Sequence, residues 1–484
     1  MGGHLPLSSF YENLGSSYPN TYMFETALVK LLGYGVFWSY TSRQCFRANV
    51  LAWILRAECF IIHSTLKPVP RFQGERLVRQ HIRILNIPVF SQRRRRPKYR
   101  IALLVDEFFG GWDTPIGGYG ALARKYICKF IPNEDIEIDL LLDSCDEMRV
   151  QKHLVDQTML YRLPRNVVKR QQWLDKQAYN LFLSIEMTEP SFALIRDYET
   201  NTPLLYWIQD PRDLTMYQPR LQTVNLIRDY DWDYIKEVSV WLSTMMQKNR
   251  VSFISQGESL SKIAREMYHI PNPMPIEDVP NPVDIECDYR LNSPPKENKV
   301  IVLGRLEAQK RVWIACEIAK AMPQHEFYIL GATGKGRNEA ANAKALEPYR
   351  NPDGSSAIKN LHFAGHVDGN VKSNHIKTAT LLLNTSIWEG IPVSWLEALS
   401  YGTLIVSAFE RDNIVGRFGT FVGEVLGDGT DKASIKKFAD AITYWMTHET
   451  ERIAKAQSAI EFVRERHSIS AFTTRLRTSI LNRI

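Results

Sequence analysis

The pattern of apolar positions changes character near residue 98. From there, short apolar runs alternate with amphipathic stretches: residues 99–105 are apolar, a glycine-rich stretch follows, residues 119–131 have helical periodicity, and residues 136–142 again resemble a strand. A strand, a glycine turn, a helix and a second strand form a βαβ unit. The pattern predicts a parallel sheet that continues through the apolar runs at residues 179–185, 203–208 and 251–255.

A proline-rich passage interrupts this pattern. Seven prolines lie within residues 271–295 (Pro271, Pro273, Pro275, Pro280, Pro282, Pro294 and Pro295), which excludes a helix interior or a central strand and predicts a linker. A second βαβ series begins at Lys299. Its predicted strands are residues 299–303, 327–330, 361–364, 380–384 and 404–407, and its predicted helices include 311–322, 392–400 and most of 431–484, with breaks near His448 and His467.

These elements predict an α/β protein in which two doubly wound, Rossmann-like domains face a cleft. Ligands of such sheets bind at the carboxyl ends of the strands. The predicted boundaries are residues 1–97 for a basic, mainly helical extension, 98–285 for the first Rossmann-like domain, 286–297 for the linker, 298–465 for the second, and 466–484 for a helix that can pack back on the first domain.

Composition and charge narrow the class of protein. A chain of 484 residues, 44% hydrophobic and 23% charged, is too long for one core and too apolar to be disordered. Its net charge is +7, and the excess positive charge lies entirely in residues 1–97. These residues include 13 Lys and Arg and 4 Asp and Glu, a net charge of +9. The remaining residues include 47 Lys and Arg and 49 Asp and Glu, a net charge of −2. The basic groups that matter for chemistry in the two domains are therefore local ones.

The first hundred residues predict neither a secretory signal nor a membrane span. No Lys or Arg precedes Lys30, and the longest charge-free apolar stretch nearby, residues 31–42, is shorter than the roughly 20 residues that cross a bilayer. The six cysteines show no Cys-x-x-Cys spacing, which fits reduced thiols. We expect a cytoplasmic protein, with peripheral contact to the inner face of the cell membrane through residues 1–97 as a further hypothesis.

The most specific chemistry follows the predicted strand 380–384. Glu389 and Gly390 form a turn, and the helix after it carries Glu397 in its second turn. The helix start (Gly390, Ile391, Pro392 and Val393) suits a phosphate, because the first backbone N–H groups of a helix lack partners and lie at the positive end of its dipole. Two carboxylates beside such a site can accept hydrogen bonds from sugar hydroxyls.

Four segments in this order resemble the motifs of one enzyme family. Glu389 and Glu397, seven residues apart and followed by Ala398 and Gly402, resemble the Glu-x7-Glu signature of retaining GT-B glycosyltransferases, especially glycosyltransferase family 4. The other three segments are Gly304-Arg305 with Lys310, which resembles that family's Gly-Arg-x4-Lys; residues 363–367, which resemble its base-contacting turn; and residues 280–284, which resemble its Pro-Asn-Gly-Val-Asp with Pro282 in place of glycine.

The resemblance implies a GT-B fold and a role for each matching residue. Arg305 and Lys310, beside Gly304, would neutralise the leaving nucleoside diphosphate without a metal ion or other cofactor, and Glu389 would hold hydroxyls of the donor sugar. Glu397 would hold the ribose. The base, which the resemblance leaves open between a UDP- and a dTDP-linked donor, would rest on Gly365, His366 and Val367.

The first domain resembles the family less closely. Gly117 and Gly118 follow the first strand and precede a helix, where backbone can approach a phosphate or sugar, although such glycines more often form a plain turn. Where many relatives carry a histidine, this chain has Gln209-Asp210, which resembles bacterial rhamnosyltransferases that build polysaccharides. Asp210 is therefore a candidate near the reacting atoms, and a purely structural role for it stays equally open.

Three other patterns carry weaker signals. Asp229 and Asp231 have the Asp-x-Asp spacing of metal-dependent transferases, but no strand precedes them, so we interpret them as a solvated acidic stretch. Residues 331–336 are glycine-rich but lack the spacing of a phosphate-binding loop. Residues 93–96, four consecutive arginines, fit a solvated linker or an anionic partner equally well.

The leading hypothesis is a metal-independent, retaining transferase that moves a sugar, with rhamnose as one candidate, to a growing polysaccharide or lipid-linked glycan. Two alternatives stay open: a non-catalytic nucleic-acid or membrane-surface binder on the same scaffold, and a nucleotide-sugar epimerase. Under the leading hypothesis no nucleic acid is expected as a partner. The basic extension, with an apolar helix-like stretch at residues 48–62, is compatible with docking on an anionic membrane. The sequence gives no oligomeric state.

Overall fold

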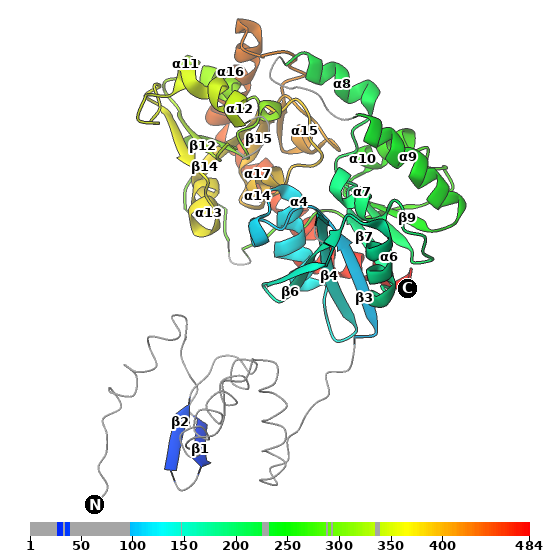
Figure 1. Ribbon diagram of the computed structural model, residues 1–484. Helices are drawn as coiled ribbons and strands as arrows, with labels where there is room; N and C mark the ends of the chain where they lie inside the picture. Colours follow the sequence, from blue (N-terminus) through cyan, green and yellow to red (C-terminus); the bar gives the residue numbers. More distant parts are fainter. Residues whose placement is uncertain are drawn as a thin grey trace, which may run out of the picture. The chain divides into compact units, whose positions relative to one another are not determined.

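The computed structural model describes the backbone of residues 27–31 and 34–38, and residues 97–484 apart from 147, 225–231, 287–288, 292–293 and 334–338. The chain divides into two compact units, Met1–Arg95 and Arg96–Ile484 (Figure 1). The predicted helical stretch at residues 48–62 and the arginine run at residues 93–96 lie outside the described residues, as do Asp229 and Asp231.

In the first unit the described residues form an antiparallel strand pair, β1 (Ala27–Leu31) and β2 (Tyr34–Trp38). The sequence predicted a mainly helical extension, and these ten residues are strands instead. The reason is local: β-branched and aromatic residues such as Val29, Val36 and Phe37 favour extended backbone.

The first domain of the second unit is built on an eight-stranded sheet with the order β10-β9-β8-β7-β3-β4-β6-β5. All neighbouring strands are parallel except β5, which pairs antiparallel with β6. The hairpin of β5 and β6 was not predicted, because the middle of β5 is exposed and has no apolar run. The strands are β3 (Tyr99–Leu104), β4 (Ile136–Cys145), β5 (Gln151–Val155), β6 (Thr158–Pro164), β7 (Leu181–Ile185), β8 (Leu204–Ile208), β9 (Val251–Ser255) and β10 (Ile276–Asp278).

Helices cover this sheet. After a short 3-10 turn at Gly111–Asp113, helical backbone runs without a break through α4 (Gly118–Ala121), a π-helical stretch (Leu122–Ile127) and α5 (Cys128–Phe130), where the sequence predicted one helix. The other helices of the first domain are α6 (Val167–Gln177), α7 (Glu189–Ile195), α8 (Leu214–Gln222), α9 (Trp232–Gln247) and α10 (Glu258–Tyr268).

The second domain holds a six-stranded parallel sheet with the order β13-β12-β11-β14-β15-β16. The strands are β11 (Glu297–Leu303), β12 (Glu326–Leu330), β13 (Leu361–Gly365), β14 (Ala379–Asn384), β15 (Leu404–Ser407) and β16 (Gly419–Phe421), the last too short to leave a periodic signal. The helices are α11 (Val312–Ala321), α12 (Glu339–Leu346), α13 (Gly369–Thr378), α14 (Val393–Ser400), α15 (Ile414–Phe418), α16 (Lys432–Thr447) and α17 (Glu449–His467), with 3-10 turns at Ala308–Lys310 and Glu347–Tyr349.

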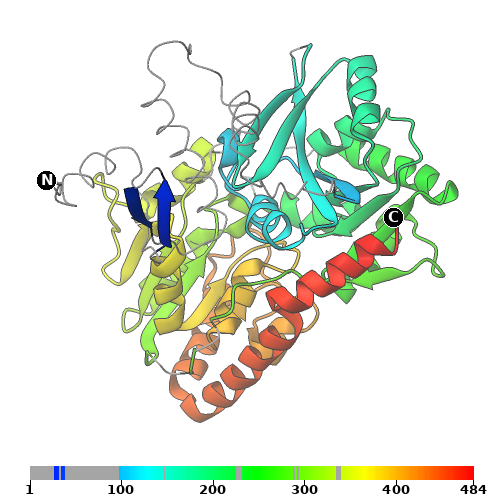
Figure 2. The ribbon, with the colours of Figure 1, turned by 90° about the horizontal axis from the view of Figure 1, so that it is seen from below.

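The last helix, α18 (Ile469–Leu481), returns to the first domain (Figure 2). Its apolar side chains Phe472, Leu476 and Ile480 are fully buried in the core beneath the eight-stranded sheet. The Phe472 ring stacks on that of Trp207 from β8, with centroids 5.8 Å apart. The chain thus passes between the domains twice. The two connecting segments are in contact, because the His467 ring donates a hydrogen bond to the Asn281 carbonyl at 2.8 Å.

Candidate active site

Two of the predicted site residues meet at the carboxyl ends of adjacent central strands. Lys310 lies in the 3-10 turn after β11, Glu389 lies in the turn after β14, and the Lys310 ammonium forms an ion pair with the Glu389 carboxylate. The Ser386 hydroxyl donates to the same carboxylate oxygen at 2.6 Å. Glu389 is buried, and both Lys310 and Ser386 hold its carboxylate in place.

The turn after Glu389 runs close to the first domain. A Cβ atom on Gly390 would lie 2.3 Å from the Gln209 carbonyl oxygen, so only glycine fits. Ile391 and Pro392 are buried, and α14 begins at Val393. Pro392 cannot be one of the backbone donors predicted at this helix start, because proline has no N–H.

Arg305 occupies a different environment from Lys310. It follows Gly304 at the end of β11, its side chain is 45% exposed, and its guanidinium pairs with Glu307 at 3.1 Å. Lys310 is 25% exposed and already paired with a carboxylate that is predicted to bind sugar. Arg305 is therefore the more accessible of the two predicted diphosphate-binding cations.

Glu397 belongs to a chain of ion pairs that reaches the first domain. The Lys372 ammonium of α13 lies 2.7 Å from the Glu397 carboxylate and 3.6 Å from Asp368, which in turn pairs with Lys125 of the first domain at 2.9 Å. Burial alone would raise the pKa of Asp368, but the Lys125 ammonium, the Gly369 N–H and Lys372 outweigh it and lower that pKa to about 2.

The predicted base-contacting segment lies at the edge of the second sheet. Gly365 ends β13 with a φ of 68°, which favours glycine, and is followed by the exposed His366 and the half-buried Val367. One strand, β12, separates β13 from β11. Because β11 pairs with β14, this segment follows a strand three positions away from the strand that precedes Glu389.

In the first domain, the glycine loop encloses a carboxylate that the sequence analysis overlooked. A Cβ atom on Gly117 would lie 1.9 Å from a Glu107 carboxylate oxygen, whereas one on Gly118 would meet open space. The Gly120 N–H donates to Glu107 at 3.1 Å. Burial raises the pKa of Glu107 to about 6, against the opposing effect of the Arg305 charge. The sequence feature that could have indicated Glu107 is the acidic pair Asp106-Glu107, which follows a buried strand.

Asp210 follows β8 and contacts both domains. One carboxylate oxygen accepts the indole N–H of Trp388 from the second domain at 3.0 Å, and the other pairs with Arg212 at 3.1 Å. The backbone N–H groups of Gln209 and Asp210 both donate to the buried Glu186 carboxylate at 2.8 Å. Burial raises the pKa of Glu186, and its hydrogen bonds hold the strand end that carries Asp210.

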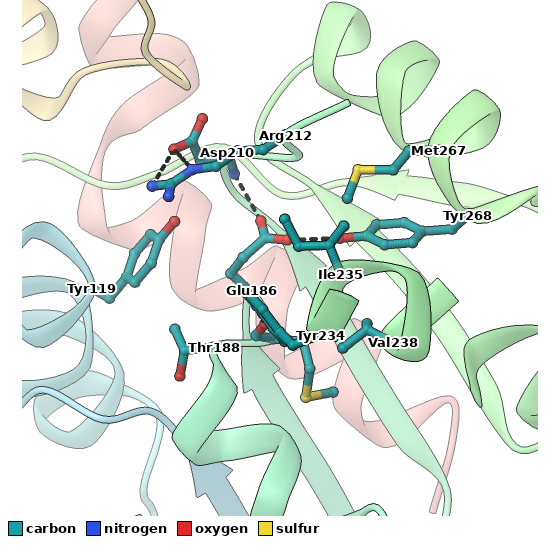
Figure 3. A pocket seen from close by; sticks show the side chains of 11 residues that line it. Tyr119, Glu186, Thr188, Asp210, Arg212, Tyr234, Ile235, Val238, Met267 and Tyr268 are labelled. Atoms are coloured by element: carbon teal, nitrogen blue, oxygen red, sulfur yellow. Dashed lines mark hydrogen bonds and ion pairs between the residues drawn. The ribbon is translucent and has the colours of Figure 1, made fainter. Parts of the chain in front are cut away.

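A cavity of about 70 Å³ opens beside Asp210 at the ends of β7 and β8 (Figure 3). Its wall has a polar side, where the hydroxyl of Tyr119 faces Asp210 and Arg212, and a largely apolar side from α9 and α10. The lining residues are Tyr119, Glu186, Met187, Thr188, Asp210, Arg212, Tyr234, Ile235, Val238, Met267 and Tyr268.

Arg311 is a second residue whose importance the sequence analysis missed. Its side chain is fully buried and donates to the carbonyl oxygens of Thr385, Val425 and Gly427 at 3.0, 2.5 and 3.1 Å. Burial lowers its pKa to about 10. Arg311 thus fixes the start of the turn that carries Glu389, directly beside Lys310.

Within the described part of the chain, no helix is long and apolar enough to cross a membrane. The same residues contain no group of three or more His, Cys, Asp or Glu side chains arranged to hold a metal ion.

Comparison with known proteins supports the two-domain description. Residues 288–465, the second domain, match the protein family described as "Glycosyl transferases group 1". A search of curated protein sequences finds no match.

Solved structures match about four fifths of the chain. The sucrose-phosphate synthase of Thermosynechococcus elongatus aligns with a TM-score of 0.58 at 14% identity, over 80% of this chain and 98% of that chain. Anabaena HepE in complex with UDP-glucose aligns with a TM-score of 0.55 at 12% identity, over 80% of this chain and 100% of that chain. The lipopolysaccharide outer core galactosyltransferase WaaB aligns with a TM-score of 0.50 at 16% identity, over 80% of this chain and 100% of that chain. At these identities the likeness establishes the fold. The predicted GT-B fold is confirmed: the second unit has two Rossmann-like domains with this fold, and the second of them matches the family described as "Glycosyl transferases group 1".

Proposed function

We propose that this protein is a metal-independent, retaining glycosyltransferase that moves a sugar from a UDP- or dTDP-linked donor to a glycan acceptor. The observation that carries the proposal is the Lys310–Glu389 pair beside Arg305, at the ends of two adjacent parallel strands in a glycosyltransferase group 1 domain. Ligands of parallel α/β sheets bind at this end of the strands.

The two cations have complementary roles in this proposal. Arg305 is 45% exposed and binds the diphosphate first, because a guanidinium matches phosphate oxygens in two-point contacts. Lys310 then turns from Glu389 to the diphosphate, which frees the Glu389 carboxylate to accept hydroxyls of the donor sugar. The start of α14, with N–H groups at Gly390, Ile391 and Val393, adds the positive end of a helix dipole.

The nucleoside binds farther along the same sheet. Glu397 accepts hydrogen bonds from the ribose while Lys372 holds its carboxylate in place, and Gly365, His366 and Val367 border the base. HepE was crystallised with UDP-glucose, which supports a nucleotide sugar as the class of donor. The choice between uracil and thymine, like the choice of sugar, is left open by this proposal.

The transfer step needs no protein side chain as a base. The bond between the anomeric carbon and the diphosphate oxygen breaks, and the acceptor oxygen bonds to the same face of that carbon. The leaving phosphate oxygen takes the acceptor's proton. Stabilising the negative charge that develops on the diphosphate is then the main task of Arg305, Lys310 and the helix start.

The acceptor binds on the side of the first domain. Asp210 and the cavity beside it supply polar groups and an apolar wall, a combination suited to the two faces of a sugar ring. A growing polysaccharide or lipid-linked glycan, rhamnose as the transferred sugar, and docking of residues 1–97 on a membrane are finer parts of the same proposal. Each rests on the sequence pattern.

A panel of nucleotide sugars tests the function. Thermal unfolding is measured with UDP- and dTDP-linked sugars, because a ligand that binds only the native state raises Tm by an amount that grows with the ratio of its concentration to its Kd. At least one donor should raise the Tm of the wild type and support sugar transfer, and the same donor should leave the Tm of Arg305→Ala unchanged. A panel without any shift or transfer would overturn the proposal.

A further inference from the structure

The cavity beside Asp210 can admit part of a sugar but not a whole ring. It holds about 70 Å³, whereas a cavity of about 150 Å³ accommodates benzene, so the space fits roughly three non-hydrogen atoms. A sugar ring with its hydroxyl groups is larger than benzene. A sugar that binds here therefore keeps its ring at the mouth and places one substituent inside the cavity.

One side of the cavity is apolar. Ile235 and Val238 lie on one face of α9, because they are three residues apart, and both are buried. Met267 of α10 extends this side (Figure 3). A methyl group is stabilised by burial against such a wall, whereas a hydroxyl group would lose its hydrogen bonds to water there.

The other side of the cavity is polar and offers both kinds of hydrogen-bonding group. The Asp210 carboxylate accepts the Trp388 indole N–H at 3.0 Å and pairs with Arg212 at 3.1 Å, so its two oxygens retain further lone pairs. The hydroxyl of Tyr119 faces this carboxylate and can donate a hydrogen bond (Figure 3). A ligand group that both donates and accepts hydrogen bonds matches this side.

The carboxylate of Glu186 also lines the cavity, but its hydrogen bonds are already made within the protein. Its Oε1 atom accepts the hydroxyl groups of Tyr206 and Tyr268, and its Oε2 atom accepts two backbone N–H groups at the end of β8. Four hydrogen bonds occupy the lone pairs of a carboxylate. Glu186 therefore shapes the cavity, and Asp210 and Tyr119 provide the polar groups for a ligand.

An acetamido group matches the size and both sides of this cavity. A hydroxyl group would leave the apolar side uncovered, and a methyl group alone would leave the polar side unmatched. We propose that the acceptor is an N-acetylated sugar whose acetamido group enters the cavity. Its N–H donates to Asp210, its carbonyl oxygen accepts from Tyr119, and its methyl group packs against Ile235 and Val238. This inference rests on the proposed function and names the class of acceptor.

Matched pairs of sugars test this inference in binding and in transfer. The methyl glycosides of N-acetylglucosamine and N-acetylgalactosamine are compared with those of glucose and galactose, from which they differ only by the acetamido group. Ligand-observed NMR with the full-length protein and UDP or dTDP measures Kd, and steady-state kinetics with the donor from the nucleotide-sugar panel measures kcat/KM. At least one acetamido sugar should exceed its partner about tenfold or more in both, the range for a group that fills a specific pocket.

Three variants test whether the preference arises in this cavity. Val238→Phe fills the cavity, and Tyr119→Phe removes only the hydroxyl group, so each should reduce the preference to less than about threefold. Val240→Phe is the matched control, because Val240 lies on the same helix with 70% of its surface exposed, and it should keep the wild-type preference. Thermal unfolding establishes that each variant is folded. If Val238→Phe does not fold, Tyr119→Phe decides the assignment.

The outcomes separate this inference from the proposed function. Transfer to the paired sugars without any preference for the acetamido group would overturn the inference and leave the proposed function standing. A preference that Val238→Phe and Tyr119→Phe both retain would overturn it as well. Selective binding of the acetamido sugars without transfer from any donor would support the cavity assignment and contradict the proposed function.

Discussion

The Trp388 indole N–H of the second domain donates a hydrogen bond to the Asp210 carboxylate of the first domain at 3.0 Å. Trp388 is buried and directly precedes Glu389, and Gly390 packs against the Gln209 carbonyl. The turn that carries the proposed sugar-binding carboxylate thus rests on the strand end that carries Asp210. The proposed donor and acceptor sides are thus connected at this contact.

The charge of Asp210 should matter more for turnover than for donor binding. Asp210→Asn keeps an oxygen that can accept the Trp388 N–H but loses the ion pair with Arg212. We expect kcat to fall about a hundredfold, the range typical for the loss of a group that stabilises the transition state electrostatically, while the Kd for UDP or dTDP changes less than about threefold. Steady-state kinetics and titration measure the two effects. Asp135→Asn, at an exposed loop position before β4, is the matched control, and full turnover by Asp210→Asn would remove Asp210 from the site.

Arg305 and Lys310 should differ in their contributions to stability. Either change to alanine should lower turnover by orders of magnitude, because each removes a charge from the proposed diphosphate site. Arg305→Ala should leave Tm within about a degree of the wild type, since its exposed ion pair contributes little. Lys310→Ala leaves the buried Glu389 without its counter-ion and should lower Tm by several degrees. Equal Tm values for the two variants would contradict the description of the Lys310–Glu389 pair.

Gly117 and Gly118 form a matched pair for a stability measurement. A methyl group at position 117 collides with the Glu107 carboxylate, so Gly117→Ala should reduce the free energy of unfolding by about 1–3 kcal/mol. A methyl group at position 118 meets open space at the first residue of α4, so Gly118→Ala should be neutral or slightly stabilising. Chemical denaturation of both variants measures the difference. If Gly117→Ala is as stable as Gly118→Ala, Glu107 does not occupy the position described.

His467 should make the domain crossing sensitive to acid. Burial lowers the pKa of His467 to about 4, with the charges of Arg466 and Arg475 acting in the same direction and the Asn281 carbonyl opposing them. The unfolded chain binds a proton near pH 6.5 and the folded protein does not, so the free energy of unfolding should fall as pH drops from about 6.5 to 4, by up to about 3 kcal/mol. His467→Asn should lose this part of the pH dependence, as measured by denaturation midpoints. His269→Asn, an exposed histidine at a helix end, should retain it, and identical pH profiles for His467→Asn and wild type would contradict the assignment.

The elements that could be predicted from the sequence are those with a continuous apolar run. Strands such as β9 and β15 begin and end at the predicted residues, because buried parallel strands consist of apolar residues bounded by polar ones. The exposed edge strand β5 and the three-residue β16 have no such run. Lys310 and Glu389 meet because the carboxyl ends of adjacent parallel strands lie at the same edge of the sheet.

Contacts between the domains could not be predicted in this way. The Asp412 carboxylate of the second domain accepts hydrogen bonds from the Glu258 and Ser259 N–H groups at the start of α10, at 3.0 and 2.7 Å. Trp388 and Asp210, like Lys125 and Asp368, are also far apart in the sequence. Periodicity describes which face of an element is buried, and it contains no information about which residue of another domain lies opposite.

The anomeric configuration of the product tests the proposed function most directly. With the donor selected by the nucleotide-sugar panel, proton NMR of the product distinguishes the two anomers through the coupling constant or chemical shift of the anomeric proton. An α-linked donor should give an α-linked product in the wild type and no product in Arg305→Ala. A product of inverted configuration would contradict the retaining mechanism, and undiminished transfer by Arg305→Ala would contradict the diphosphate site on which the proposal depends.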